Sequence, residues 1–281
     1  MSRRLDGGSL RVILVNYRCL DGIAEHLRSP VFHDCDVILV DNASDPQQVA
    51  ELARSTGARA LYMDRNVGFA AAVNAAARLP AREGSAHSAT LLLNPDVEID
   101  EQQLAALLRH LQQSDADAVG PVLVDEHGRV WVSSAGGPIT LRSVAWYFLF
   151  LSHLVPRLSG FFWTRRQVTR GPVEVPRWLC GACLLVRADA FERFGYLPTD
   201  EIVYGEDVGW GVAATARGAR LVLARDVVVR HVGGQSGGSD AWVDATIRTM
   251  RRHLGPVRGP VASLVVRAGL GLRRIAHRVR G

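Results

Sequence analysis

The sequence predicts an α/β protein in which helices flank a mostly parallel β-sheet and a separate helical tail follows. Apolar segments of strand character alternate with helical segments through the first 125 residues, an order typical of right-handed strand–helix–strand crossovers. With 48% of its 281 residues hydrophobic, the chain can bury a sizeable core. After about residue 240 the sequence becomes rich in arginine and helical in its spacing.

Five short apolar segments in the first part of the chain are expected to form strands. They cover residues 10–17, 36–42, 58–63, 89–94 and 116–124. Four segments with helical spacing of apolar residues separate them. They cover residues 20–28, 46–57, 68–79 and 100–113, and Gly57 ends the second. We assign Glu98 and Asp100 to the start of the fourth helix, where acids complement the helix dipole.

Beyond residue 125 the alternation is less regular. We expect a hairpin at 126–137, an apolar helix at 141–155 and a basic aromatic loop at 161–170. A further strand is expected from Cys183 onward, and a helix from Asp207 to Gly218. The organisation therefore divides into residues 1–125, 126–240 and 241–281.

Four cysteines and the absence of long apolar stretches indicate where the protein resides. Cys19, Cys35, Cys180 and Cys183 do not form the two close pairs that a zinc site needs, so we expect small buried thiols in a reducing compartment. No stretch reaches the roughly 20 apolar residues that span a bilayer, and no signal-peptide core is present. The expected location is the cytoplasm.

Charge is concentrated in the tail. Nine arginines and no acid lie beyond residue 244, so the whole-chain excess of +5 leaves the preceding part net negative. That distribution, with no basic aromatic groove pattern in the body, argues against nucleic-acid binding. The glycine-rich dinucleotide fingerprint and the P-loop motif do not occur.

Polar residues follow four of the predicted strands. In parallel sheets the carboxyl ends of the strands share one edge, and ligands bind beyond it. The residues are Asn16 and Tyr17, Asp41 and Asn42, Asp64 and Asn66, and Asn94 and Asp96. Turn geometry alone also favours Asn and Asp, so each position by itself is compatible with an ordinary turn. Their recurrence at four strand ends favours a site for a polar ligand.

Two acids, Glu206 and Asp207, open a predicted helix in the later part of the chain. Acids in a first turn can simply complement the helix dipole, or one of them can act as a general base. His231 ends a predicted strand, and the segment "VGGQSGG" follows it, whose backbone N–H groups can bind phosphate. Both the structural and the ligand-binding interpretation stay open for these residues.

Seven motifs together resemble one protein family. In order they are "VNY", "VDNAS", "NVGFAAAVN", "LLLNPD", "WLCGACLLVRADAFERFG", "YGEDVGW" and "HVGGQS". This order resembles the family 2 inverting glycosyltransferases, within them the rhamnosyltransferase-like branch, from about Arg11 to Ser239. The resemblance implies a GT-A fold, a Rossmann-like sheet in which a nucleotide-sugar-binding half (1–125) continues into an acceptor-binding, catalytic half (126–240).

The resemblance also implies which residues bind the nucleoside-diphosphate sugar. Asp41 corresponds to the aspartate that reads the nucleotide base, and Asp96 occupies the place of the metal-binding D-x-D motif. Asn94 replaces the first aspartate of that motif, which keeps an oxygen but removes a charge. The full donor-binding set is Asn16, Tyr17, Asp41, Asn66, Gly68, Phe69, Asn74, Asn94, Asp96 and Gln235.

Roles for the metal and the acceptor follow from the same resemblance. Asp96 and His231 would hold Mg²⁺ or Mn²⁺, which stabilises the charge of a departing diphosphate. Asp207 would take the proton of the acceptor hydroxyl, with Glu206 beside it. The acceptor-binding set is Trp178, Gly181 and Glu206.

The resemblance favours transfer of L-rhamnose from dTDP-rhamnose to a hydroxyl of a saccharide, lipid-linked glycan or glycoconjugate. This chemistry belongs to polysaccharide biosynthesis. A second hypothesis is a nucleotide-sugar-binding protein that has lost turnover and serves in an assembly. The substitution at Asn94 is the feature that favours this alternative.

The arginine-rich tail carries a helical stripe of apolar residues. They are Val261, Leu264, Val265, Ala268, Leu272, Ile275 and Val279. Such a helix can lie on an anionic bilayer, which would put the protein at the inner face of the cell membrane. Packing against the body or pairing in a homodimer are the alternatives, and Gly269 and Gly271 weaken the helix.

Overall fold

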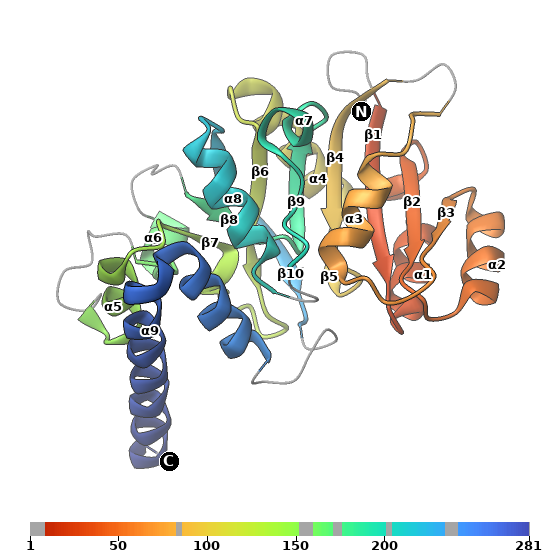
Figure 1. Cartoon of the computed structure of the whole chain (residues 1–281). Helices are drawn as coiled ribbons and strands as arrows, with labels where there is room; N and C mark the ends of the chain where they lie inside the picture. Colours follow the sequence, from red (N-terminus) through yellow and green to blue (C-terminus); the bar gives the residue numbers. More distant parts are fainter. Residues whose placement is uncertain are drawn as a thin grey trace.

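The structure is a computed structural model of the chain, and it describes residues 9–82, 86–151, 160–170, 176–200, 204–233 and 241–280. Helices cover both faces of a central sheet, and the C-terminal helix extends well away from it (Figure 1). The α/β class predicted from the sequence is confirmed, together with the mostly parallel sheet and the helical tail.

The elements predicted for the first part of the chain are all present. The strands are β1 (Ser9–Asn16), β2 (Asp36–Asp41), β3 (Arg59–Tyr62), β4 (His87–Leu93) and β6 (Ala118–Val124). The helices are α1 (Leu20–Arg28), α2 (Pro46–Thr56), α3 (Phe69–Ala77) and α4 (Glu101–Gln113), with a 3₁₀ turn η1 (Pro30–Phe32) after α1. Apolar periodicity and turn residues were sufficient to locate them.

The later elements are shorter and less regular. The strands are β5 (Val97–Glu98), β7 (Ala135–Gly136), β8 (Trp178–Leu179), β9 (Cys183–Arg187) and β10 (Leu221–His231). The helices are η2 (Val132–Ser134), α5 (Leu141–Phe148), α6 (Arg165–Arg170), α7 (Ala190–Phe194), α8 (Glu206–Ala216) and α9 (Ala241–Arg280).

The order of the strands differs from their order in the chain. In the part of the chain that the structure describes, eight strands form one sheet in the order β3-β2-β1-β4-β9-β6-β10-β5, and β7 pairs with β8 separately. β9 lies antiparallel between β4 and β6, with Leu185 opposite Leu91 and Val119. β9 and β10 therefore join strands from the first part of the chain, and the two halves share one continuous sheet.

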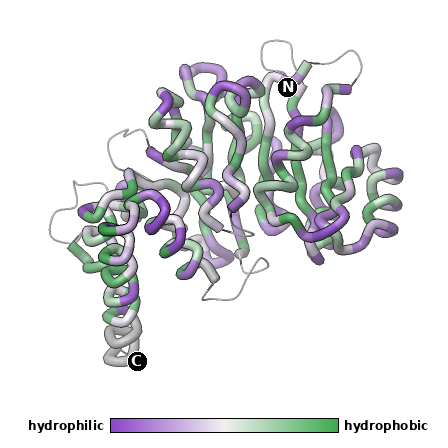
Figure 2. Tube along the Cα trace, in the orientation of Figure 1, coloured by the Kyte–Doolittle hydropathy of each residue, from purple (hydrophilic) through white to green (hydrophobic). Residues whose placement is uncertain are grey.

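Side chains that alternate along each strand build two separate cores. Val12 and Leu14 of β1 face α1, α2 and α4, whereas Ile13 and Val15 face α3, α7 and α8. A third apolar cluster joins α5, the first turn of α8 and α9. Figure 2 shows the hydrophobic residues along the central strands, while the tail alternates between apolar and polar residues.

The start of α4 confirms one predicted cap and corrects another. Asp100 and Gln103 form a capping box, in which each side chain accepts a hydrogen bond from the other residue's backbone N–H at 2.8 Å. The sequence also predicts Glu98 at this helix start, and that prediction is wrong. Glu98 lies in β5 and pairs with Arg230 at 3.2 Å, because β5 runs antiparallel to the end of β10.

Three predictions for the middle of the chain need correction. The hairpin expected at 126–137 is reduced to a bridge between Val124 and Val130, after which η2 and β7 follow. The helix expected at 141–155 ends at Phe148, and part of that range lies outside the described residues. The loop expected at 161–170 contains a helix, α6, whose start is fixed by Thr164 and Gln167.

The tail helix α9 is bent rather than continuous. Gly255, with φ of 74° and ψ of −174°, breaks the helix, and Pro256 begins the second part. A Cβ at position 269 would lie 2.2 Å from the carbonyl oxygen of Phe148, so Gly269 permits close packing on α5 rather than weakening an isolated helix. Within the described residues, no helix combines the length and apolar content required to cross a bilayer.

A buried ionic cluster stabilises the amino ends of β1 to β4, at the side of the sheet opposite to the polar carboxyl ends. Asp36 accepts hydrogen bonds from Arg11, Arg59 and Arg82 at 3.1–3.3 Å, and the His87 ring lies 2.8 Å away. Arg11 also donates to backbone carbonyls at the end of α3. These partners outweigh the effect of burial and lower the pKa of Asp36 from 3.8 to about 2.

We expect Asp36→Ala to lower the free energy of unfolding by about 3–5 kcal/mol, because Arg11 would stay buried without its carboxylate. Urea denaturation against pH checks this. Since the folded state depresses the pKa of Asp36, its contribution is complete above the unfolded-state pKa and is lost as the pH falls from about 4 to 2. Asp34→Ala, at an exposed neighbouring position, is the matched control. Equal stability of the two variants would contradict the assignment.

Candidate functional site

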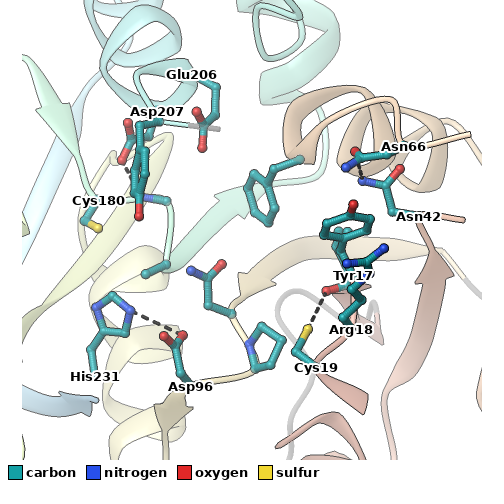
Figure 3. A pocket seen from close by; sticks show the side chains of 17 residues that line it. Tyr17, Arg18, Cys19, Asn42, Asn66, Asp96, Cys180, Glu206, Asp207 and His231 are labelled. Atoms are coloured by element: carbon teal, nitrogen blue, oxygen red, sulfur yellow. Dashed lines mark hydrogen bonds and ion pairs between the residues drawn. The ribbon is translucent and has the colours of Figure 1, made fainter. Parts of the chain in front are cut away.

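A cavity of about 460 Å³ opens at the carboxyl ends of β1, β2 and β4, beside the start of α8 and the end of β10. Figure 3 shows its lining side chains, which come from segments far apart in the sequence. They are Val15, Tyr17, Arg18, Cys19, Asn42, Asn66, Phe69, Asn94, Pro95, Asp96, Cys180, Gly181, Ala182, Tyr204, Glu206, Asp207 and His231. The polar strand ends thus lie around one cavity.

Asp96 and Asp207, the two acids on which the expected chemistry depends, both line this cavity. Asp96 follows β4, and Asp207 lies in the first turn of α8. In Figure 3 the carboxylates of Asp207 and Glu206 lie in the upper part of the view. The carboxylate of Asp96 lies below them, with the His231 ring beside it. A donor and an acceptor can therefore meet in the space between them.

Two backbone N–H groups hold the carboxylate of Asp207. The N–H of Gly181 donates to Oδ2 at 2.9 Å, and the N–H of Val208 donates to Oδ1 at 2.7 Å. A Cβ at position 181 would lie 3.2 Å from the Cβ of Asp207, so glycine permits this approach. Burial raises the pKa of Asp207, against the effect of the hydrogen bonds. A carboxylate with a raised pKa is a better proton acceptor at neutral pH.

Glycines allow α8 to present the two acids to the cavity. Gly205 precedes the helix with a left-handed φ of 94°, and a Cβ there would lie 2.4 Å from Oγ1 of Thr249 in α9. A Cβ at position 211 would lie 2.6 Å from Cα of Trp178 in β8. Gly211 of "VGWGV" is thus required because α8 lies directly against β8, whereas a Cβ at Gly209 would lie 2.9 Å from Cγ of Pro198.

Asp96 and His231 form a pair on the lower wall of the cavity. Nε2 of His231 lies 3.3 Å from Oδ1 of Asp96, and their side chains are only 13% and 4% exposed. The ring of Trp131 packs on the His231 ring, with centroids 5.2 Å apart. Trp131 is itself held to β6 by its backbone N–H, which donates to the carbonyl of Leu123 at 2.8 Å. The imidazole is therefore fixed between Trp131 and the carboxylate.

This pair fits a divalent cation that a diphosphate also binds. Oδ1 of Asp96 is buried, and apart from its ion pair with Nε2 of His231 no hydrogen bond from the described residues satisfies it. Carboxylate and imidazole both bind Mg²⁺ or Mn²⁺. The residues that the structure describes contain no cluster of three or more His, Cys, Asp and Glu side chains able to hold a metal ion. Phosphate oxygens and water would complete the coordination, as is usual for Mg²⁺.

The opposite wall offers an exposed ring and a cation. Tyr17 is 42% exposed, and the guanidinium of Arg18 lies 5.3 Å from the centre of its ring. Arg18 has a left-handed φ of 60°, which turns the chain sharply after β1. Phe69, at the start of α3, also lines this part of the cavity.

An amide pair connects two of the strand ends. Nδ2 of Asn42 donates to Oδ1 of Asn66 at 2.9 Å, and Oδ1 of Asn42 accepts the N–H of Val67 at 2.9 Å. Gly68, which the sequence predicts as a donor-binding residue, donates its N–H to Oδ1 of Asn66 at 3.0 Å but does not line the cavity. Asn42 and Asn66 thus shape the wall, and Gly68 supports it from behind.

Asn16 and Asp41 lie beneath the cavity wall. Nδ2 of Asn16 donates to Oδ1 of Asp41 at 3.1 Å and to Ser44, and the Ser44 hydroxyl donates to Asp41 at 2.8 Å. Both predicted residues are 1% exposed and do not line the cavity. In this structure they order the turn after β2 on which Asn42 lies.

Two further predicted site residues lie in the core. Asn74 is 3% exposed, and its amide group exchanges two hydrogen bonds with the backbone of Leu197 at 2.8 and 3.0 Å. Trp178 is 1% exposed and packs on Phe161. Neither side chain lines the cavity, and their assignment to donor and acceptor binding stays a prediction. Gln235 lies outside the described residues.

Sequence reasoning missed several cavity residues. Asn42 is among the polar strand ends but not in the predicted donor-binding set, and Arg18, which directly follows the "VNY" motif, was missed. Tyr204 opens the "YGEDVGW" motif but received no predicted role; it has a left-handed φ of 68° and a pKa raised by burial and by Asp96 and Glu206. Its position depends on how the chain enters α8.

The cysteines divide into two kinds. All four are free. Cys35 and Cys183 are buried as predicted, and burial raises the pKa of Cys183 to about 12. Cys19 and Cys180 instead line the cavity, and burial raises the pKa of both thiols, which keeps them neutral.

Comparison with known proteins identifies related sequences. The chain matches the family described as "Glycosyl transferase family 2" over residues 12–171. An N-acetylglucosaminyl-diphospho-decaprenol L-rhamnosyltransferase of Mycobacterium tuberculosis is 31% identical over 272 residues, covering 87% of this chain and 85% of the relative. A low-salt glycan biosynthesis hexosyltransferase of Haloferax volcanii is 24% identical over 201 residues, covering 71% and 59%.

Solved structures share the fold. GalNAc-T7 with UDP, GalNAc and Mn²⁺ has a TM-score of 0.57 at 13% identity, covering 89% of this chain and 48% of the other, so this chain spans about half its length. Residues 1–349 of S. aureus TarS in complex with UDP-GlcNAc have a TM-score of 0.52 at 14% identity, covering 93% and 71%. At such identities the likeness establishes the fold alone.

The sheet, its cavity at the carboxyl ends of the strands and these relatives define a glycosyltransferase with a fold of GT-A type. The chain belongs to glycosyl transferase family 2, and its relatives include an L-rhamnosyltransferase. The family, the branch and the fold that the sequence motifs indicate are thus confirmed.

We expect Asn74→Ala to lower the free energy of unfolding by about 1–3 kcal/mol, because the backbone of Leu197 loses both partners. Its affinity for a donor nucleotide should stay unchanged, since Asn74 does not reach the cavity. Asn66→Ala, the matched amide at the cavity wall, should instead weaken nucleotide binding about tenfold. Urea denaturation and calorimetric titration with dTDP measure the two effects. If Asn74→Ala weakens binding as much as Asn66→Ala, Asn74 contacts the donor after all.

Proposed function

We propose that this glycosyltransferase moves L-rhamnose from dTDP-rhamnose, with inversion, to a hydroxyl of a saccharide or lipid-linked glycan. The observation that carries the proposal is the convergence of Asp207 with Asp96 and His231 on one cavity. The choice of sugar is supported by the 31% identity with the mycobacterial L-rhamnosyltransferase. The lipid-linked acceptor is supported by the same relative, whose name gives a diphospho-decaprenol acceptor.

The nucleoside of the donor fits the wall formed by Tyr17, Asn42 and Asn66. An exposed aromatic ring can stack on a base, and amide groups can hydrogen-bond its polar edge. Asp41 supports this wall through the turn that precedes α2. Arg18, exposed at the mouth, can pair with a phosphate group.

The diphosphate of the donor requires positive charge at the other wall. Three carboxylates line the cavity, those of Asp96, Glu206 and Asp207, and they would repel an anionic ligand. Asp96 and His231 would hold Mg²⁺ or Mn²⁺ beside the diphosphate, with the neutral oxygen of Asn94 nearby. When bound there, the ion supplies electrostatic stabilisation of the departing nucleoside diphosphate.

The acceptor hydroxyl reacts at the wall formed by α8. Asp207 removes its proton as the hydroxyl oxygen attacks the anomeric carbon, and the bond from that carbon to the diphosphate breaks on the opposite face. The sugar is inverted in a single displacement, so no covalent enzyme intermediate is needed. Glu206 orients the acceptor, and the backbone N–H of Gly181 fixes Asp207 during the transfer.

A nucleotide-sugar-binding protein without turnover is the alternative. Asn94 favours it, because the cavity lacks the first charge of a D-x-D motif and metal binding is weakened. The raised pKa and firm positioning of Asp207 favour turnover instead. Release of nucleoside diphosphate separates the two proposals.

We expect the wild-type protein to release dTDP from dTDP-rhamnose with Mg²⁺ or Mn²⁺ and an acceptor glycan, in preference to UDP- and GDP-sugars. Asp207→Asn should lower kcat by about 10²–10⁴, because the proton acceptor is lost while size is kept. Donor affinity should be unaffected, as calorimetric titration would measure.

Asp226→Asn is the control for this variant, since that carboxylate is 65% exposed and pairs with His110 away from the cavity. Undiminished turnover in Asp207→Asn would refute its role as base. Donor binding by the wild type with no turnover for any acceptor would favour the alternative without activity.

Removal of the metal should act through Asp96. We expect Asp96→Ala to weaken Mn²⁺-dependent donor binding at least about tenfold, because an ionised ligand to the ion is lost. EDTA should weaken donor binding by the wild type and have no further effect on the variant. Asp64→Ala, an exposed acid after β3 that does not line the cavity, is the control. Donor affinity that does not depend on metal in the wild type would contradict the metal site.

A further inference from the structure

We propose that the outward face of the second part of α9, residues 256–273, docks in the headgroup region of a bilayer that contains anionic phospholipid. This surface is separate from the cavity, and the proposal does not depend on which sugar is transferred. It rests on the exposure, the rigidity and the charge of that helix.

The second part of α9 is apolar on two opposite faces. The inward residues are Gly259, Ala262, Ser263, Val266 and Gly269, all buried. The outward residues follow one another at intervals of four, three and eight positions, which keeps them on one side of a helix. They include four of the large exposed hydrophobic side chains among the described residues. These are Val257, Val261, Leu264 and Leu272, which are 79%, 49%, 70% and 50% exposed.

The buried face of the helix is formed by residues that do not belong to the apolar stripe predicted from the sequence. Of the stripe, Val261, Leu264 and Leu272 face solvent, whereas Val265 is partly buried against the third apolar cluster. Those three exposed side chains therefore do not serve to pack the helix on the body. A helix that already buries one face has no internal use for a second apolar face. An exposed apolar stripe of this kind marks an interaction site.

The helix cannot rotate to hide its outward face. Gly269 lies against the backbone of Phe148, where a Cβ would be 2.2 Å from the carbonyl oxygen. The guanidinium of Arg273 lies 4.6 Å from the ring centre of Tyr147 and 5.1 Å from that of Phe150. These contacts with α5 and the residues after it hold the helix in one orientation, projecting from the body (Figure 1).

The charge of the helix selects the partner. Arg258 and Arg267 are exposed, and at 3.6 residues per turn they lie on opposite sides of the apolar stripe. Beyond residue 244 the chain has nine arginines and no acid. A second copy docked on this face would bring like charges together, whereas anionic headgroups complement them. An amphipathic helix with this composition lies in the plane of the membrane surface.

The same helix is connected to the reacting end of the cavity. Thr249, in the first part of α9, packs on Gly205, which directly precedes Glu206 and Asp207. The third apolar cluster also includes Val208 of α8 together with Ala262 and Val266 of α9. Docking of α9 would therefore hold the start of α8 at a set distance from the bilayer, which suits an acceptor carried by a lipid.

Co-sedimentation of the full chain with vesicles tests the proposal. We expect binding to vesicles of phosphatidylcholine with phosphatidylglycerol and much weaker binding to phosphatidylcholine alone. Val261→Gln with Leu264→Gln should reduce binding at least about tenfold, because two side chains that enter the interface become polar. Val228→Gln, 46% exposed on β10, is the matched control and should bind as the wild type does.

A charge variant separates the electrostatic contribution to membrane binding from the apolar contribution. Arg258→Gln with Arg267→Gln should lower binding to the anionic vesicles about tenfold or more, and the difference should shrink at high salt. Donor binding by calorimetry should be unchanged in all variants, which distinguishes a failure of this proposal from a failure of the proposed function. Binding that the glutamine variants leave unchanged would overturn the proposal. So would a dimer in sedimentation analysis that Val261→Gln with Leu264→Gln dissociates, since a second copy would then occupy the face.

Discussion

The hydrogen bond from the backbone N–H of Gly181 to Asp207 joins the parts of the molecule on which the site depends. Gly181 lies in the turn between β8 and β9, and β9 is held in the sheet between β4 and β6. The next residue, Ala182, accepts the N–H of Asn94 at 2.8 Å, directly before the loop that carries Asp96. Two consecutive residues thus connect the loop of Asp96 to the helix of Asp207, and the register of β4 against β9 sets the distance between the two acids.

The two ends of the sheet use buried charge in opposite ways. At one end, Asp36 is surrounded by three arginines and a histidine, so its charge is compensated and contributes to stability. At the carboxyl ends of the strands, the buried Oδ1 of Asp96 has no hydrogen bond from the described residues and only an ion pair with His231 at 3.3 Å. Such atoms are costly in the free protein, and a ligand that satisfies them gains the corresponding free energy. The charges that stabilise the fold therefore lie at the amino ends of the strands, and the atoms that can bind a ligand lie at the carboxyl ends.

The tail packs against the body of the protein along both of its parts. Its first part supports Gly205 through Thr249, and its second part packs on α5 through Gly269. The apolar cluster between α5, α8 and α9 is continuous, so α9 packs directly on the helix that carries Asp207. The close contacts made by these glycines leave little freedom for the parts to move independently.

The sequence by itself determined the elements of the first 125 residues and the edge of the sheet that bears the site, because periodicity and turn chemistry are local properties. It also determined the family through the order of its motifs. Tertiary structure alone decided that β9 runs antiparallel, since an apolar run such as "CLLVR" is compatible with either direction. It likewise decided that Asn74 serves Leu197, 123 positions away, and that Trp178 is buried under α8. The type of a side chain shows which groups it can bind, whereas only the folded structure shows which of these groups it contacts.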